Sequence, residues 1–371
     1  MRKNLLYLAL CFFMIACDSV KDNNGNGAVV INLDEIEKGK IELDEVEYIP
    51  LETTDFSLLG RIDKVLYQKD KFYVLDKKTG GVYVFDRKGK FLSSVCKQGE
   101  GPDEYIEMTD MDVDEEGNIY IADNAKMNII KYSSPDWSFD KKYHIGEHFH
   151  EFCKQGESTF IIKDIFEATG LKFKLSSYDV HNQSLNPILK KSLTEVDELK
   201  ILKCAKFNLY RSGKDVYYYE RFTPNIYRVL KNGEIDNIYT ISSEKYISEG
   251  DLKPMEMNPM VFLQERNHIK DIVSLYATDD YFVCLLFLAP SATFLFIPWN
   301  NPTEARTVNL MEYSSFTGTS GIEGVVEDKL LFIFNQLDEQ VKMKDEKLQN
   351  IDEDSNPVLM LCRLKISTVQ S

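Results

Sequence analysis

An internal repeat constrains the fold of this chain more than any other feature of its sequence. FYVLDKKTGGVYVF, residues 72–85, aligns without a gap with IYIADNAKMNIIKY, residues 119–132, at an offset of 47 positions. VYYYERFTPNIYRV, residues 216–229, aligns again 97 positions further on, which is about two periods. Strand-rich repeats of about 40 to 50 residues are typical of β-propellers, in which each repeat forms one four-stranded blade.

Further units complete the series. Two strand-like runs within residues 160–179 supply the blade that the double offset requires, residues 272–299 supply a fifth, and residues 321–335 with 358–366 supply a sixth. Gly, Asn and Asp separate runs of alternating apolar and polar residues, as expected of hairpins. Regular alternation of strands and helices is missing, so two α/β domains are disfavoured. We predict an all-β, six-bladed β-propeller with four-stranded antiparallel blades.

The sixth unit ends after three strands. EVEYIPLE, residues 45–52, is strand-like and precedes the first inner strand, GRIDKVLYQ at residues 60–68. Pairing of this N-terminal strand with the last blade would close the ring and protect edges that otherwise promote aggregation. A single propeller is therefore predicted over residues 45–371.

Residues 1–17 have the features of a lipoprotein signal peptide. Arg2 and Lys3 precede an apolar run too short to span a bilayer comfortably, and the run ends in MIAC, which is similar to a lipobox. Cys17 would then carry the lipid and begin the mature chain, and residues 18–44 would form a tether and lead-in. An ordinary cleaved signal or a membrane anchor is the alternative.

Charge and cysteine content narrow the possible partners. The formal charge is −16, from 44 basic and 60 acidic residues. This charge repels phosphates and anionic headgroups, so nucleic acid is not an expected partner. The seven cysteines fall to five if Cys11 is removed and Cys17 is lipidated, and they are too scattered for a disulfide framework. Cys204, Cys284 and Cys362 lie in apolar segments and are expected to be buried.

GEGPDEYIEMTDMDVDEEGNIYIADNAKMNIIKY, residues 99–132, resembles the NHL repeat in its glycine-rich turn, its hairpin and its aromatic-ended strand. With the stretch at residues 47–65 and the lipobox, the whole mature chain looks like the six-bladed β-propeller lipoproteins of Gram-negative bacteria. The resemblance implies a lipid-anchored envelope protein, most simply of the outer membrane. Where the NHL pattern often has Arg, this chain has Asn128, with Asn225 and Gly81 at the equivalent places, so RNA-binding relatives are poor guides.

Two motifs in this stretch suggest ligands. GEGP, residues 99–102, lacks the helix N-terminus that a phosphate loop needs, so we predict a turn between two blades. Asp112, Asp114, Glu116 and Asp123 match calcium-loop positions, but strands rather than helices flank the loop. The matching sites of the first blade carry no such ligand set, so the hairpin does not require calcium.

Three of the five histidines, His144, His148 and His150, lie in HIGEHFHE. His-x-His on one strand face could bind zinc, although a blade connection with incidental histidines is commoner. The sequence has no Ser nucleophile elbow, HExxH or CxxC motif. We predict no cofactor, with calcium or zinc as the alternatives.

Ligands of propellers commonly bind where the loops into the inner strands meet the loops between second and third strands. Aromatic, amide and guanidinium groups on that face suit a sugar, a peptide or a carboxylate. The candidate ligand-binding residues are Tyr105, Asn128, Arg221, Phe222, Asn225 and Arg266.

The fold alone does not select a function, because propellers serve both as enzymes and as binding platforms. Without a recognisable catalytic motif, we expect a monomeric, non-catalytic lipoprotein that binds an envelope protein, a peptide or a glycan. The alternative is a hydrolase or lyase with a metal or carboxylates in the central channel. In that case polar side chains near Asp110, Asp112 and Asp271 would point together into the channel.

Overall fold

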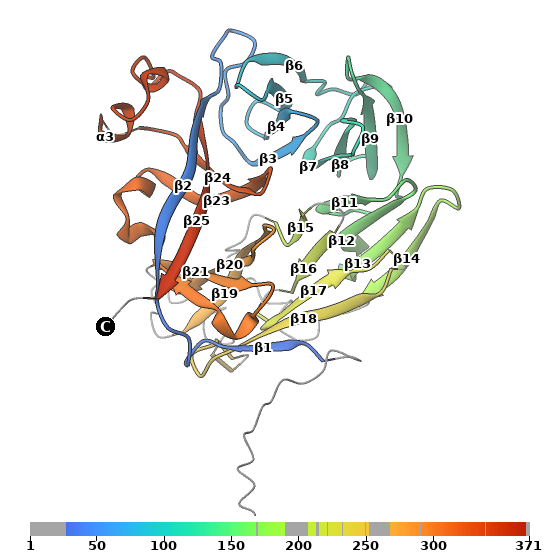
Figure 1. Cartoon of the computed structure of the whole chain (residues 1–371). Helices are drawn as coiled ribbons and strands as arrows, with labels where there is room; N and C mark the ends of the chain where they lie inside the picture. Colours follow the sequence, from blue (N-terminus) through green and yellow to red (C-terminus); the bar gives the residue numbers. More distant parts are fainter. Residues whose placement is uncertain are drawn as a thin grey trace, which may run out of the picture.

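The computed structural model describes residues 27–167, 170–189, 207–212, 215–220, 222–231, 233–248, 250–251, 268–288, 291–337 and 339–368. These residues form six sheets placed radially around a central axis (Figure 1). Five sheets have four strands and one has five. The predicted six-bladed β-propeller is therefore confirmed.

Each blade extends from an inner strand beside the axis to an outer strand at the rim. In that order, blades one and two comprise β3 (Lys64–Gln68), β4 (Lys71–Asp76), β5 (Gly81–Asp86) and β6 (Phe91–Val95), then β7 (Met108–Val113), β8 (Ile119–Asp123), β9 (Asn128–Ser133) and β10 (Ser138–His144). Blades three and four comprise β11 (Glu151–Gln155), β12 (Thr159–Glu167), β13 (Gly170–Asp179) and β14 (Ser184–Leu189), then β15 (Leu209–Ser212), β16 (Asp215–Tyr219), β17 (Asn225–Val229), β18 (Ile235–Ser242) and β1 (Val29–Asn32). Blades five and six comprise β19 (Ile269–Ala277), β20 (Tyr281–Leu288), β21 (Ser291–Pro298) and β22 (Arg306–Val308), then β23 (Thr319–Val326), β24 (Lys329–Phe334), β25 (Val358–Thr368) and β2 (Gly39–Pro50).

The helical segments whose bounds lie within the described residues are short. They are η2 (Pro302–Glu304), η3 (Leu310–Glu312), η4 (Ser314–Phe316), α3 (Glu339–Lys342) and η5 (Glu346–Leu348). Within the described ranges, no helix has the length and apolar character needed to cross a bilayer.

The middle strands are apolar on both faces because each lies between two neighbouring blades. In β4, Phe72 and Val74 pack toward blade six, whereas Tyr73 and Leu75 pack toward blade two. Successive side chains of a strand point to opposite faces, so this alternation fills two interfaces from one strand. Each repeat therefore supplies apolar side chains to two blade interfaces, one on each face of its blade.

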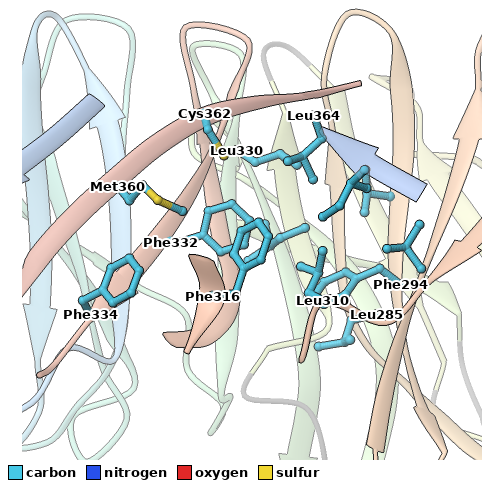
Figure 2. Packing of buried hydrophobic residues seen from close by; sticks show 14 of the residues in the cluster. Leu285, Phe294, Leu310, Phe316, Leu330, Phe332, Phe334, Met360, Cys362 and Leu364 are labelled. Carbon is cyan, nitrogen blue, oxygen red and sulfur yellow. The ribbon is translucent and has the colours of Figure 1, made fainter. Parts of the chain in front are cut away.

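The hydrophobic core is divided among the contacts between adjacent blades. Six buried clusters correspond to the six blade interfaces of the described structure. Figure 2 shows the interface of blades five and six, where Phe294 and Leu285 face Phe332 and Met360 across Phe316. No blade can bury its own faces alone, so each blade depends on both of its neighbours.

Buried aspartates at the ends of second strands fix the loops that lead into the inner strands. Asp76 accepts a hydrogen bond of 2.6 Å from the backbone N–H of Gly60. Asp123 accepts one of 3.1 Å from the backbone N–H of Glu107, at the same sequence separation of 16 residues. The carboxylate at the end of FYVLD and IYIAD is thus a structural element of the repeat.

An N-terminal strap, residues 29–50, runs along the outer edges of three blades. β1 pairs in parallel with β18 of blade four, and Lys38 forms a parallel bridge with Thr307 of blade five. β2 then pairs antiparallel with β25, from Gly39 opposite Thr368 to Pro50 opposite Val358. Figure 1 shows β2 in blue beside β25 in red.

The predicted closure by an N-terminal strand is confirmed, since β2 completes the sixth blade. The strand begins at Gly39, before the expected residue 45. Residues 29–44, assigned to the lead-in, contribute β1 and the first half of β2. The signal peptide and Cys17 lie outside the described residues.

Replacing Ile49 should test how far the ring depends on this closure. Ile49 is 2 % exposed and packs between blades six and one. We expect Ile49→Ala to lower the free energy of unfolding by about 2–4 kcal/mol, through lost burial and a cavity. Val46 on the same strand is 40 % exposed, so Val46→Ala should change it by less than about 0.5 kcal/mol. Urea denaturation gives both values, and equal small losses would show that β2 is dispensable.

Candidate functional site

A cavity of about 700 Å³ occupies the central channel. Each of the six inner strands contributes residues to its wall. The inner strands contribute Lys64–Gln68, Asp112 and Val113, Cys153, Leu209–Ser212, Val273–Ala277 and Ile322–Val325. The cavity is therefore built from segments far apart in the sequence that only the closed ring brings together.

One end of the cavity lies among the turns that follow the inner strands. We call this side of the ring the hairpin face, defined by turn residues 69–70, 114–118, 156–158, 278–280 and 327–328. Gln68, Asp279 and Asp328 at or beside these turns line the cavity. The opposite side, where the chain enters the inner strands, is called the loop face.

Aromatic rings form much of the wall and are fixed by hydrogen bonds to the backbone. The Tyr276 hydroxyl donates to the carbonyl of Ile322 at 2.6 Å, and the Tyr210 hydroxyl donates to Phe207 at 2.6 Å. Trp299 Nε1 donates to the carbonyl of Thr278 at 2.8 Å. The full aromatic set is Tyr67, Phe207, Tyr210, Tyr217, Tyr276 and Trp299.

Burial keeps these phenols in their neutral form. It raises the pKa of Tyr210 and of Tyr276 well above the ordinary value, and in both cases nearby Glu323 acts in the same direction. Burial and the charge of Asp215 raise the pKa of Tyr217 to about 12. At neutral pH the cavity therefore presents phenol hydroxyls and ring faces, not phenolates.

The cavity wall is acidic. Seven carboxylates and two cations occur among the described residues that line it. The two cations are neutralised: Lys64 Nζ lies 2.8 Å from Asp110 Oδ1, and Arg211 pairs with Asp112. Burial alone would lower the pKa of Lys64, but Asp110, Cys153 and Asp112 together outweigh it and the pKa is raised. The carboxylates are Asp63, Asp112, Asp215, Asp279, Glu323, Glu327 and Asp328.

Carboxylates also connect neighbouring inner strands. Asp110 of blade two accepts a hydrogen bond of 3.1 Å from the backbone N–H of Phe152 in blade three. Glu151 of blade three accepts bonds of 2.6 and 3.1 Å from the backbone N–H groups of Asn208 and Leu209, at the start of blade four. These bonds satisfy donors on strand edges that no fifth strand covers.

The acidic residues whose convergence in the channel would favour the alternative of a hydrolase or lyase do not line the cavity as a group. Asp112 lines the cavity, whereas Asp110 and Asp271 are absent from its described lining. Asp110 accepts hydrogen bonds from Lys64 Nζ and from the backbone N–H of Phe152. Asp271 accepts hydrogen bonds of 3.3 and 3.0 Å from the backbone N–H groups of Phe222 and Ile272.

The ligand residues predicted from the sequence lie away from the cavity lining. Tyr105 is fully buried, and its hydroxyl donates to the carbonyl of Gly80 at 2.6 Å. Asn128 Oδ1 lies 2.9 Å from His144 Nδ1. Phe222 is buried before β17, and Asn225 accepts a bond of 2.9 Å from the Thr240 hydroxyl. These four belong to loops or strand starts on the loop face, and Arg221 and Arg266 lie outside the described residues.

The histidines of HIGEHFHE are dispersed along the connection from blade two to blade three. His144 pairs with Asn128, and His148 Nδ1 lies 3.0 Å from the carbonyl of Asn124. The backbone N–H of His150 donates to the carbonyl of Lys163 at 3.4 Å. In the described part of the chain, no group of three or more His, Cys, Asp or Glu is placed to hold a metal ion.

In the acidic hairpin DVDEEGNIYIAD, the Asp114 carboxylate binds backbone N–H groups of the same hairpin. Asp114 accepts hydrogen bonds from the backbone N–H groups of Glu116 and Asn118, at 3.1 and 2.9 Å. It also accepts one of 2.8 Å from the Tyr120 hydroxyl. Asp112 accepts hydrogen bonds from the backbone N–H of Lys154 and from the Arg211 guanidinium, and both donors belong to other blades.

GEGP forms the predicted turn between the outer strand of blade one and the inner strand of blade two. The backbone N–H of Gly101 donates to Glu104 Oε2 at 2.7 Å. A Cβ atom on Gly99 would lie 2.2 Å from the same oxygen. Glycine is needed here because a side chain would collide with the carboxylate that holds the turn.

Sequence reasoning missed the residues that form the cavity. Tyr67, Tyr210 and Tyr276 lie on inner strands and are only partly buried. Aromatic residues at inner-strand positions were the available signal, since a strand that borders a channel exposes part of each inward-facing side chain.

Comparison with known proteins extends these observations. A family model described as Domain of unknown function (DUF4934) matches residues 28–363. A search of curated proteins finds no match.

Two solved structures from Bacteroides are similar to this chain. One, from Bacteroides fragilis NCTC 9343, is described as exported and superposes with a TM-score of 0.72 at 16 % identity, covering 91 % of this chain and 100 % of that one. The other, a member of the DUF4221 family from Bacteroides vulgatus, has a TM-score of 0.55 at 13 % identity and covers 90 % and 100 %. At these identities the likeness shows the fold alone.

Replacing Asp112 should test the connections around the channel. Asp112 is 1 % exposed and accepts from the backbone N–H of Lys154 while pairing with Arg211. Asp112→Ala leaves both groups without this acceptor, so we expect the free energy of unfolding to fall by about 3 kcal/mol. Asp215 is exposed at the hairpin face, and Asp215→Ala should change it by less than about 0.5 kcal/mol. Chemical denaturation gives the free energy of unfolding of both variants. A loss below about 0.5 kcal/mol in Asp112→Ala would contradict the role of Asp112 in connecting the inner strands.

Proposed function

This chain belongs to the DUF4934 family, and we propose that it is an exported, non-catalytic protein that binds a small ligand in its central cavity. The cavity is the observation that carries this proposal. Its volume of about 700 Å³ lies within the range of about 300 to 1,000 Å³ that is usual for small-molecule sites. Its aromatic wall with a limited set of polar groups also matches the usual composition of such sites.

The chemistry of the wall supports binding rather than turnover. Asp112 is held by a cation and a backbone N–H, so its oxygens are already engaged. Burial raises the pKa of the Cys153 thiol to about 12, which keeps it protonated and weakly nucleophilic at neutral pH. A nucleophile needs a pKa near the working pH, and the Cys153 thiol lacks that property.

The hydrophobic N-terminal segment and the exported Bacteroides fragilis protein of similar fold support a location in the cell envelope. We assign the anchor to a lipid on Cys17 and the location to the outer membrane. A glycan, a peptide or an envelope protein would then supply the ligand, and the chain would act as a monomer.

Blocking the cavity should abolish ligand binding. Val325 lines the cavity, and Val325→Trp would fill part of it. We expect maltotriose, spermidine or a short Lys-containing peptide, at about 100 times its Kd, to raise the Tm of the full chain in detergent by about 4 °C. The rise should vanish in Val325→Trp.

Leu92→Trp is the matched control, because Leu92 is 43 % exposed on an outer strand. It should retain the full shift of Tm. Equal shifts in both variants, or none in the unmodified protein, would contradict binding in the cavity. Turnover of any probe, lost in Val325→Trp, would favour the alternative of a hydrolase or lyase.

Replacing Cys17 should release the protein from the membrane. Cys17→Ser removes the thiol that would carry the lipid, so we expect loss of radiolabelled palmitate incorporation and a shift from the membrane fraction to the soluble fraction. Cys96→Ser, which removes an exposed thiol of the propeller, should keep both properties. Unchanged labelling of Cys17→Ser would exclude lipidation at this residue.

A further inference from the structure

Carboxylates gather at the end of the cavity that lies on the hairpin face. Each described turn that follows an inner strand carries at least one acidic residue, and Asp215 begins the strand after the remaining turn. Most of these side chains are exposed. The acidic residues are Asp70, Asp114, Glu115, Glu116, Glu157, Asp215, Asp279, Asp280, Glu327 and Asp328.

Two of these carboxylates stand at the mouth of the cavity without an ion-pair partner among the described residues. Asp215 and Asp279 line the cavity, are exposed, and make no ion pair within the described part of the chain. Their neighbours Glu327 and Asp328 are partly compensated, by Arg87 at 3.4 Å and by Arg363 at 3.1 Å. Asp215 and Asp279 are therefore the carboxylates of the described mouth whose charge is not already shared with an arginine.

The wall beyond the mouth offers the faces of aromatic rings to a ligand. The protein's own cations already use such faces, since Lys64 Nζ lies 4.8 Å from the centre of the Phe207 ring. Ser274 lines the cavity, is 6 % exposed and has its hydroxyl beside that of Tyr276.

Negative charge also extends from the mouth toward the interior. Burial and the Glu323 charge raise the pKa of Tyr276, and burial together with the hydrogen bond to Glu327 raises the pKa of Tyr67. Burial is the larger cause for both tyrosines, and the negative charges of Glu323 and Glu327 add to it. These two charges would favour a cationic over an anionic ligand.

We propose that the cavity takes an organic cation, whose alkylammonium or guanidinium group lies near Asp215 and Asp279 and whose carbon chain packs on the aromatic wall. This inference rests on the proposed function and specifies its ligand. A cation over an aromatic face is stabilised by the ring quadrupole, more strongly when it is partly desolvated. A free polyamine and a Lys or Arg side chain of a peptide share this chemistry.

Calorimetric titration of the full chain in detergent can test the proposal. The probes are spermidine, the capped peptide Gly-Lys-Gly-Lys-Gly, its Gln counterpart Gly-Gln-Gly-Gln-Gly, and maltotriose. We expect binding of at least one cationic probe, weakening as salt is added, and no binding of the Gln peptide. Tighter binding of the Lys peptide would identify a peptide as the source of the cation, and tighter binding of spermidine would identify a polyamine.

The decisive variant is Asp215→Asn with Asp279→Asn, which keeps the shape of both side chains. We expect cation affinity to fall about tenfold. Glu115→Gln with Glu116→Gln is the matched control: it removes the same charge from exposed residues of the same face that are not in the cavity lining. The control should stay within about twofold, and unchanged Tm values would show that all variants are folded.

The remaining outcomes separate this inference from the proposed function. If maltotriose or the Gln peptide binds, this binding is lost in Val325→Trp and no cationic probe binds, the inference of a cationic ligand is wrong. The proposal that the cavity binds a ligand would then still stand. Cation binding weakened equally by both double variants would show general charge attraction and overturn the site. No binding of any probe would overturn the inference and the proposed function together.

Discussion

The inner strand of each blade has one edge that no further strand can cover, and the structure depends on how its polar groups are satisfied. An unsatisfied buried N–H costs about 1–3 kcal/mol. The chain supplies acceptors from the neighbouring blade, as Asp110 does for Phe152 and Glu151 does for Leu209. Hydrogen bonds to a charged acceptor are among the stronger ones. These bonds fix the inner strands against each other and so define the walls of the cavity.

This constraint explains why many acidic residues near the axis are poor candidates for catalysis. Asp76 and Asp123 hold loops, and Asp110 and Asp271 bind backbone N–H groups. Among the carboxylates of the described cavity lining, those of Asp215 and Asp279 on the hairpin face accept no structural hydrogen bond and make no ion pair. The acidic mouth on the hairpin face therefore remains available for a ligand, and its charge is the main chemical difference between the cavity and an ordinary hydrophobic core.

The fold could be predicted from the sequence because its determinants are local and repeated. The offset of 47 positions sets Phe72 of β4 over Ile119 of β8, and double-sided apolar strands indicate blades packed on both faces. The partner of β2 followed from counting strands in the last repeat. β1 was not predicted, because four residues beside an Asn- and Gly-rich stretch carry no repeat signal.

The site was harder to predict because its residues share no local pattern. Tyr67, Tyr210, Tyr276 and Glu323 meet only when the ring is closed. The expected site on the loop face came from general propeller architecture, and residues such as Tyr105 have side chains that complete loops there. Which inner-strand residues are inward-facing depends on register, and bulges such as that between Ile272 and Ser274 shift the register within a strand.

The strap has a mechanical consequence. Tension applied to the chain before residue 29 reaches the parallel β1–β18 pair before it reaches the β2–β25 ladder that closes the ring. Pulling a strand along its own axis strains all of its inter-strand bonds together, so β1 would resist as a unit and detach before β2. Blade four would still keep its four other strands. The ladder that closes the ring is therefore loaded only after the fifth strand of blade four has separated.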